Sequence, residues 1–144
     1  MNSETDPHSY DPTPNDFKAL NNADVIISNG LHLEGRMHED IIRTTKLNNN
    51  TLIMMSDGLP SSAFLLEDNI PDPHIWFNVK NWKKCINYSV NKLIISLPEF
   101  KDKWSAKLAE ENKKLDDLDT WVTTSIASIP ENARVLVTAH DAFS

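Results

Sequence analysis

Two copies of one tripeptide are the clearest chemical feature of this sequence. Asp6-Pro7-His8 lies near the start of the chain, and Asp72-Pro73-His74 repeats it later. Proline fixes its own φ at about −65° and disfavours helix at the residue before it, so each copy predicts a stiff arm that ends in an imidazole. A third histidine, His140, follows the apolar run Val135–Ala139. Neutral imidazole is the commonest metal ligand, so we hypothesise that His8, His74 and His140 meet at one metal site.

A second interpretation needs no metal. Asp-Pro commonly starts a turn, and a histidine after it is often only a polar loop residue. Zinc-finger and metalloprotease ligands come in pairs a few residues apart, whereas these three histidines are widely separated. Only the tertiary fold could bring them together. Asp6 and Asp72 likewise leave two roles open, because each carboxylate could orient its histidine or simply cap its turn.

Composition narrows the class of protein. A chain of 144 residues is enough for one ordinary domain, and its net charge of −7 argues against a nucleic-acid partner. A single cysteine, Cys85, excludes an internal disulfide, and we expect it to be a small core residue. No apolar run approaches the roughly 20 residues that span a bilayer. Residues Met1–Thr5 have neither a basic nor an apolar region, so no secretory signal is predicted there.

The first half of the chain reads as an α/β unit. Thr13-Pro14-Asn15-Asp16 predicts the start of a short helix that ends near Asn22. Strands are predicted at residues 24–28 and 51–55, with a helix over about 34–46 between them. This order favours a parallel sheet covered by helices. Residues 59–73 look irregular, and His32 and His38 are expected to be surface histidines.

Two helices dominate the second half. Asn78 predicts a cap for a helix to about Ile95, with an apolar face at steps of three and four. Ser96-Leu97-Pro98-Glu99 predicts a capping box that opens a much longer helix, to about Ser128. Some 30 residues make a rod of roughly 45 Å, which suits a strut between lobes or a coiled-coil arm. Arg134–Ala139 is then predicted to be a final strand with His140 at its C-terminal edge.

Three separated stretches of the sequence resemble one family. They are "DPHSYDPTPNDFKALNNADVIISNGLHLEGRM" (Asp6–Met37), "DPHIWFNVKNW" (Asp72–Trp82) and "RVLVTAHDAF" (Arg134–Phe143). In this order they resemble the metal-specific solute-binding proteins of bacterial ABC importers, the TroA-like zinc and manganese receptors. The resemblance implies two α/β lobes joined by a long helix, with Zn²⁺ or Mn²⁺ held between them as transported ligand. It places the metal ligands on His8, His74 and His140.

The resemblance also implies a division of the chain and a set of partners. Residues 1–97 would form an incomplete N-terminal metal-binding lobe that lacks its first strand. Residues 98–130 would form the connecting helix, and residues 131–144 the start of a truncated C-terminal lobe. Family members are periplasmic or cell-surface lipoproteins that deliver metal to a membrane permease. Their signal sequence, their first strand and the aspartate that supplies the fourth ligand have no counterpart in this sequence, which we therefore expect to be an internal piece.

Other functions remain open at this point. Three histidines with an open fourth position also hold catalytic zinc, so a zinc-dependent hydrolase with Asp141 as its acid or base is one alternative. His38-Glu39-Asp40-Ile41-Ile42 lacks the second histidine of a metalloprotease helix. A fragment of the receptor that binds no metal is another alternative. If the histidines do bind metal, protons must compete with it, so affinity should fall as pH drops through about 6.5.

Overall fold

The predicted short helix is the first helix among the described residues. A computed structural model of the protein describes residues 6–143; Met1–Thr5, where we predicted no secretory signal, and Ser144 lie outside the described residues. Helix α1 spans Pro14–Asn22, with Thr13 as its N-cap. The Thr13 side chain accepts from the backbone N–H of Asp16, and the Asp16 carboxylate accepts from the backbone N–H of Thr13. This reciprocal capping box satisfies two backbone N–H groups at the start of the helix, which is why the helix begins here.

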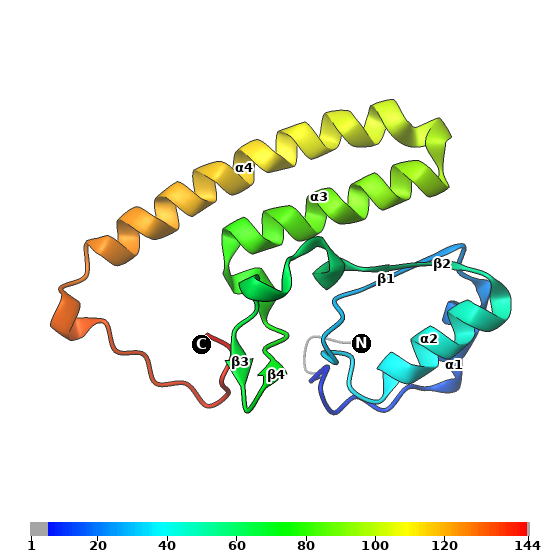
Figure 1. Cartoon of the computed structure of the whole chain (residues 1–144), viewed down its shortest axis with the longest axis horizontal. Helices are drawn as coiled ribbons and strands as arrows, with labels where there is room; N and C mark the ends of the chain where they lie inside the picture. The colour runs from blue at the N-terminus through cyan, green and yellow to red at the C-terminus, as the bar shows by residue number, and fades with distance from the viewer. Residues whose placement is uncertain (1–5, 144) are drawn as a thin grey trace.

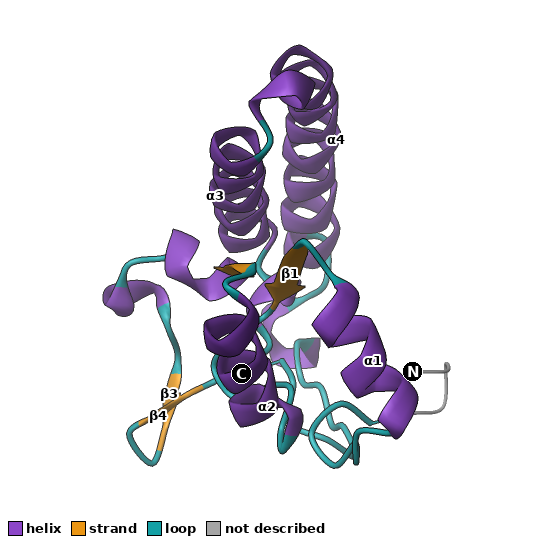
Figure 2. Ribbon diagram, turned by 90° about the vertical axis from the view of Figure 1, so that its right-hand side faces the viewer, coloured by secondary structure: helices purple, strands orange, loops and turns teal. Residues whose placement is uncertain are grey.

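The predicted parallel sheet is confirmed, and it has two strands. Strand β1 (Val25–Ser28) pairs in parallel with β2 (Thr51–Met54). Helix α2 (Met37–Asn48) makes the crossover between them, as parallel strands require. Figures 1 and 2 show α1 and α2 packed near β1. One core cluster, Leu20, Ile26 and Ile41, joins α1, the sheet and α2.

The segment that we predicted to be irregular contains a small hairpin. Strands β3 (Leu66–Glu67) and β4 (Ile70–Pro71) are antiparallel. Asp68 and Asn69 between them have φ of 49° and 66°, the left-handed region that a two-residue hairpin turn requires. Asp and Asn tolerate this region better than most residues, so the dipeptide was a turn signal that our sequence interpretation missed.

Helix α3 (Val79–Ser96) carries the second core. Its N-cap is Asn78, whose side chain accepts from the backbone N–H of Asn81, as predicted. Cys85 faces inward and is fully buried beside Leu59 and Ile75, which confirms its expected core role. Burial raises the pKa of the Cys85 thiol to about 11. This cluster supports the segment that carries His74, because Ile75 follows that histidine directly.

The longest helix starts later than predicted. Helix α4 spans Lys101–Ala127 and has a length of roughly 40 Å. The predicted capping box at Ser96 is wrong, because Ser96 lies in the last turn of α3 and a 3-10 turn, Pro98–Phe100, precedes α4. Leu97 stands before a proline, which disfavours helical geometry there, so α3 ends and the chain reverses. The two helices then run side by side, and α4 extends past α3 (Figures 1 and 2).

An amide pair joins these two helices. Asn87 Nδ2 donates to Asn112 Oδ1 at 2.8 Å, and Asn112 Nδ2 donates to Asn87 Oδ1 at 3.0 Å. A reciprocal pair of this kind is satisfied at one register only, so it specifies how α4 lies along α3.

The predicted strand at Arg134–Ala139 is wrong. Residues 134–138 have no regular structure, and the apolar side chains of Val135, Leu136 and Val137 are 79%, 68% and 90% exposed. A strand needs a neighbour for its N–H and C=O groups, and within residues 6–143 no strand pairs with this segment. The segment instead returns from the far end of α4 towards β3 (Figure 1). Among the described residues, 6–143, no helix is long and apolar enough to span a membrane.

Candidate metal centre

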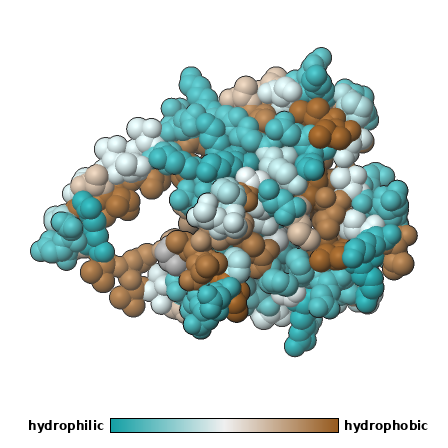
Figure 3. All heavy atoms as spheres, viewed as in Figure 1, coloured by the Kyte–Doolittle hydropathy of each residue, from teal (hydrophilic) through white to brown (hydrophobic). Residues whose placement is uncertain are grey.

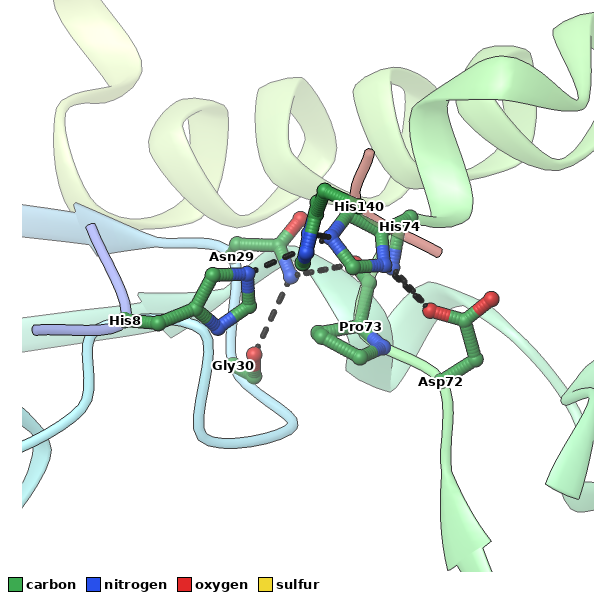
Figure 4. A network of polar contacts seen from close by, with 7 residues as sticks. All are labelled: His8, Asn29, Gly30, Asp72, Pro73, His74 and His140. Carbon is green, nitrogen blue, oxygen red and sulfur yellow. Dashed lines mark hydrogen bonds and ion pairs between the residues drawn. The ribbon is translucent and has the colours of Figure 1, made fainter. Parts of the chain in front are cut away.

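The structure brings His8, His74 and His140 together from three separate parts of the chain. His8 lies before α1, His74 precedes the 3-10 turn Ile75–Phe77, and His140 lies in the segment that returns from α4. His74 Nε2 is 3.2 Å from His8 Nε2 and 3.0 Å from His140 Nε2 (Figure 4). One ring nitrogen from each residue lies within 4.8 Å of the other two. Among the described residues, this is the only cluster of three or more His, Cys, Asp or Glu side chains so arranged.

These separations suit a metal ion. Two nitrogens that are each about 2.0–2.1 Å from one tetrahedral Zn²⁺ lie about 3.3 Å apart. The two nitrogen–nitrogen distances at His74 are close to that value. The three residues differ in exposure: the His74 side chain is 6% exposed, His8 is half-buried and His140 is exposed. His74 is therefore the anchored member of the cluster, and His140 is the one most open to solvent.

Asp72 orients the ring of His74. Its Oδ1 accepts from His74 Nδ1 at 2.6 Å and from the His74 backbone N–H at 2.9 Å. With the ring proton on Nδ1, the lone pair of Nε2 faces His8 and His140, which is the form that binds a metal. Asp72 thus shows both of the roles left open for it, because it caps its own turn and also hydrogen-bonds the His74 ring.

Asp6 occupies the same position in the first tripeptide and does something else. Its Oδ1 accepts from the backbone N–H of His8, and its Oδ2 accepts from the Ser9 hydroxyl at 2.8 Å. These hydrogen bonds, the one from Ser9 first, lower the pKa of Asp6. Its carboxylate caps a turn and makes no hydrogen bond to a ring nitrogen among those described, so the identical motifs have different local roles.

The loop between β1 and α2 supports both histidine arms. Asn29 Nδ2 donates to the carbonyl of Pro73, directly before His74, at 3.0 Å (Figure 4). Gly35, in the same loop, packs so closely against the first arm that an added Cβ would lie 2.3 Å from the His8 carbonyl oxygen. In the sequence, Asn29-Gly30 indicates only the end of a strand, so neither residue is predicted to belong to the site. The sequence does hold one signal for this loop, because Gly30, Glu34 and Gly35 lie close together in it.

The cluster opens onto a solvent-exposed cavity. The His8, His74 and His140 side chains share its walls with His32 and with four carboxylates, which are Glu67, Asp68, Asp72 and Asp141. Glu67 and Asp68 belong to the β3–β4 hairpin. Clustered negative charge raises the local concentration of cations, which suits a site that receives them from solvent.

The two histidines expected at the surface differ from each other. His32 is exposed, but the side chain of His38 is only 12% exposed. His38 Nδ1 lies 3.9 Å from Glu34 Oε2, and the His32 and His38 ring centroids are 4.5 Å apart. The prediction of a surface position is therefore wrong for His38, because α2 presents it to the loop that leads into the helix.

The whole chain matches one known protein family and about half the length of its relatives. Residues 1–144 match the family model described as "ZnuA: Zinc-uptake complex component A periplasmic". The chain is 39% identical to the zinc-binding protein TroA of Treponema pallidum over 99% of its own length and 46% of that protein. It is 34% identical to the manganese-binding lipoprotein MntA of Bacillus subtilis, over 100% of this chain and 47% of MntA. The chain thus spans about half the length of these relatives.

Solved structures agree in fold. The periplasmic zinc-binding protein TroA from Treponema pallidum superposes with a TM-score of 0.88 and 39% identity, over 96% of this chain and 50% of TroA. Fe(III)-bound YtgA from Chlamydia trachomatis superposes with a TM-score of 0.86 and 28% identity, over 100% of this chain and 50% of YtgA. The names of these relatives describe metal-binding proteins, and they give no support to the hydrolase interpretation.

Proposed function

Because the chain belongs to the family of ZnuA, the periplasmic component A of a zinc-uptake complex, we propose that it captures a divalent metal ion through His8, His74 and His140. The observation that carries this proposal is the convergence of three ring nitrogens within 4.8 Å of one another. A hydrogen bond from His74 Nδ1 to Asp72 directs the other ring nitrogen of His74 towards this cluster. The metal is cargo, and the site needs only to bind and release it. We assign no catalytic step to the chain, because its relatives are named as metal-binding proteins.

Zn²⁺ is the metal that the donor set favours, with Mn²⁺ second. Neutral imidazoles suit Zn²⁺, whereas Mn²⁺ prefers more oxygen ligands. The relatives support both choices, because one is named for zinc and another for manganese. Carboxylates that line the same cavity could complete the coordination, and Asp141 adjoins His140.

The division of the chain follows the same proposal. Residues 1–97 form the metal-binding lobe, residues 98–130 the connecting helix and residues 131–144 the start of a second lobe. Uncovered apolar surface supports this division. Trp121 and Ile126 on α4 are 66% and 51% exposed, and Val137 on the returning segment is 90% exposed. Figure 3 shows an opening bordered by apolar side chains between the end of α4 and this segment. A second lobe would cover that surface.

Delivery and location complete the proposal. The whole protein of which this chain is the matching half would be a periplasmic or cell-surface lipoprotein. It would pass its metal to the membrane permease of an ABC importer. The family description supports the periplasmic placement, and the lipoprotein name of MntA supports the surface anchor.

A zinc titration tests the proposal. Calorimetry at neutral pH on the 144-residue chain should show one saturable site, and His74→Ala should abolish it. Asp117→Asn is the control, since Asp117 is exposed on α4, outside the cavity and outside the loop that contacts the histidine arms, and its loss should leave the site intact. No saturable site in the unmodified chain, or an equal response of the two variants, would overturn the assignment. The former result would favour a fragment that binds no metal.

A further inference from the structure

The loop between β1 and α2, residues 29–36, has an unusual backbone. Gly30, Leu31, His32 and Gly35 all have positive φ, between 50° and 84°. This geometry is costly for Leu31 and His32, so surrounding contacts must hold it in place. The loop contacts both histidine arms, through the Asn29 hydrogen bond to the Pro73 carbonyl and through the close approach of Gly35 to His8. The position of each arm therefore depends on the conformation of this one loop.

Glu34 is the side chain that closes the loop on itself. Its Oε1 accepts from the backbone N–H of Asn29 at 2.6 Å and from that of Gly30 at 3.3 Å. The Glu34 side chain is only 13% exposed. Its Oε2 is buried and has no hydrogen-bond partner among the described residues, with His38 Nδ1 at 3.9 Å. Burying a carboxylate costs free energy, and here only the two hydrogen bonds to Oε1 offset that cost.

We propose that Glu34 is a positioning residue of the three-histidine site. Its carboxylate fixes the start of loop 29–36, and the loop then sets the spacing of the His8 and His74 arms. The proposal rests on the metal-binding function proposed above. It extends that function to Glu34, which makes no described hydrogen bond to His8, His74 or His140. Asn29 is the direct link, because its backbone N–H binds Glu34 while its side chain binds the Pro73 carbonyl.

The chemistry of the contact predicts which substitutions are tolerated. Glu34→Gln keeps a carbonyl oxygen that can accept from both backbone N–H groups. Glu34→Ala leaves these N–H groups without their acceptor and opens space inside the loop. Loss of a group that hydrogen-bonds a metal ligand directly typically weakens metal binding by about 10–100-fold. Glu34 acts through Asn29, so we expect a loss at the lower end of that range, about tenfold. A charge-free glutamine should therefore preserve the site, and alanine should not.

Binding of Co²⁺, followed by its visible absorption, is the first readout. Glu34→Ala should weaken Co²⁺ binding by about tenfold and change the spectrum at saturation. Glu34→Gln should stay within about threefold of the unmodified chain, as should Glu39→Ala, which removes an exposed acid from the first turn of α2. Ile41→Val controls for stability: it should lower the thermal midpoint by trimming the core without moving affinity or spectrum. Unchanged binding in Glu34→Ala would overturn the proposal.

A second readout needs no metal. Nuclear Overhauser contacts between the ring protons of His8 and His74 should be present in the metal-free chain, in Glu34→Gln and in Ile41→Val, and absent in Glu34→Ala. If the unmodified chain binds no Co²⁺ but these contacts behave as stated, the metal-binding function fails while the positioning role stands. If the ring contacts persist in Glu34→Ala, or are missing from the unmodified chain, the positioning role is rejected whatever the metal does.

Discussion

Asp72 Oδ1 accepts two hydrogen bonds from His74, one from the ring Nδ1 at 2.6 Å and one from the backbone N–H at 2.9 Å. The two bonds fix the direction of the arm and the rotation of the ring together. Asp6 makes the corresponding backbone bond to His8 but uses its other oxygen on Ser9. The contrast predicts that the two aspartates contribute unequally to metal binding.

Removal of the Asp72 carboxylate should therefore weaken the site. Asp72→Ala frees the His74 ring to rotate and removes the acceptor that selects its metal-binding tautomer, so Zn²⁺ affinity should fall by about 10–100-fold. Asp6→Ala is the matched control from the repeated motif and should cost roughly tenfold less. Calorimetric titration of both variants measures the difference. Equal losses would show that both aspartates act only as turn caps.

Acid should release the metal. An imidazole must be neutral to donate its lone pair, and the pKa of free histidine is about 6.5, so protons compete more strongly as pH falls. We expect Zn²⁺ affinity to drop by at least about tenfold between pH 7.5 and pH 5.5. Titrations in non-chelating buffers at both values check this. The same affinity at both would argue against histidine ligation.

Asp16 should make folding stability depend on pH in a lower range. Hydrogen bonds from Tyr10 and then from Thr13 lower the pKa of Asp16 to about 2. A lowered native pKa stabilises the fold above the unfolded value of about 3.9, and that contribution disappears as pH falls towards 2. Asp16→Asn should thus lower the thermal midpoint at pH 7, with a difference that shrinks below pH 4.

A control separates this effect from general loss of charge. Asp117 is exposed on α4, and Asp117→Asn should change the midpoint little at any of these pH values. Thermal unfolding at pH 7, 4 and 2.5 compares the two variants with the unmodified chain. A midpoint difference for Asp16→Asn that stays constant across this range would contradict the assigned cause.

Cys85 should be chemically inert in the folded chain. Its side chain is fully buried, and burial raises the thiol pKa to about 11, so very little reactive thiolate exists at pH 8. Reaction with a disulfide reagent such as dithionitrobenzoate should be at least about 100-fold slower than in denaturant. The rate of thionitrobenzoate release measures this. Fast reaction of the native chain would mean that α3 separates readily from the core.

Local signals in the sequence predicted much of the fold. Thr13-Pro14 and Asn78 were read correctly as helix starts, because capping depends on neighbours within one turn. The spacing of two apolar runs around a helix predicted the parallel sheet. The three histidines were selected from the repeated tripeptide and from a position after an apolar run. The helix starts depended on residues that are close together in the chain, and the sheet and the histidines were predicted from patterns that recur along it, so none of these inferences needed a tertiary contact.

Only the tertiary structure decided what depends on distant partners. Arg134–Ala139 has the composition of a strand, but a strand requires a neighbour that this segment lacks among the described residues. The different roles of Asp6 and Asp72 are equally invisible in two identical tripeptides, because each side chain turns towards the donors that the fold supplies. The sequence by itself determined which residues could hold a metal and the local geometry of two arms. The packing of loop 29–36 against both arms decided how closely His8 and His74 approach, since that spacing joins segments that no local rule connects.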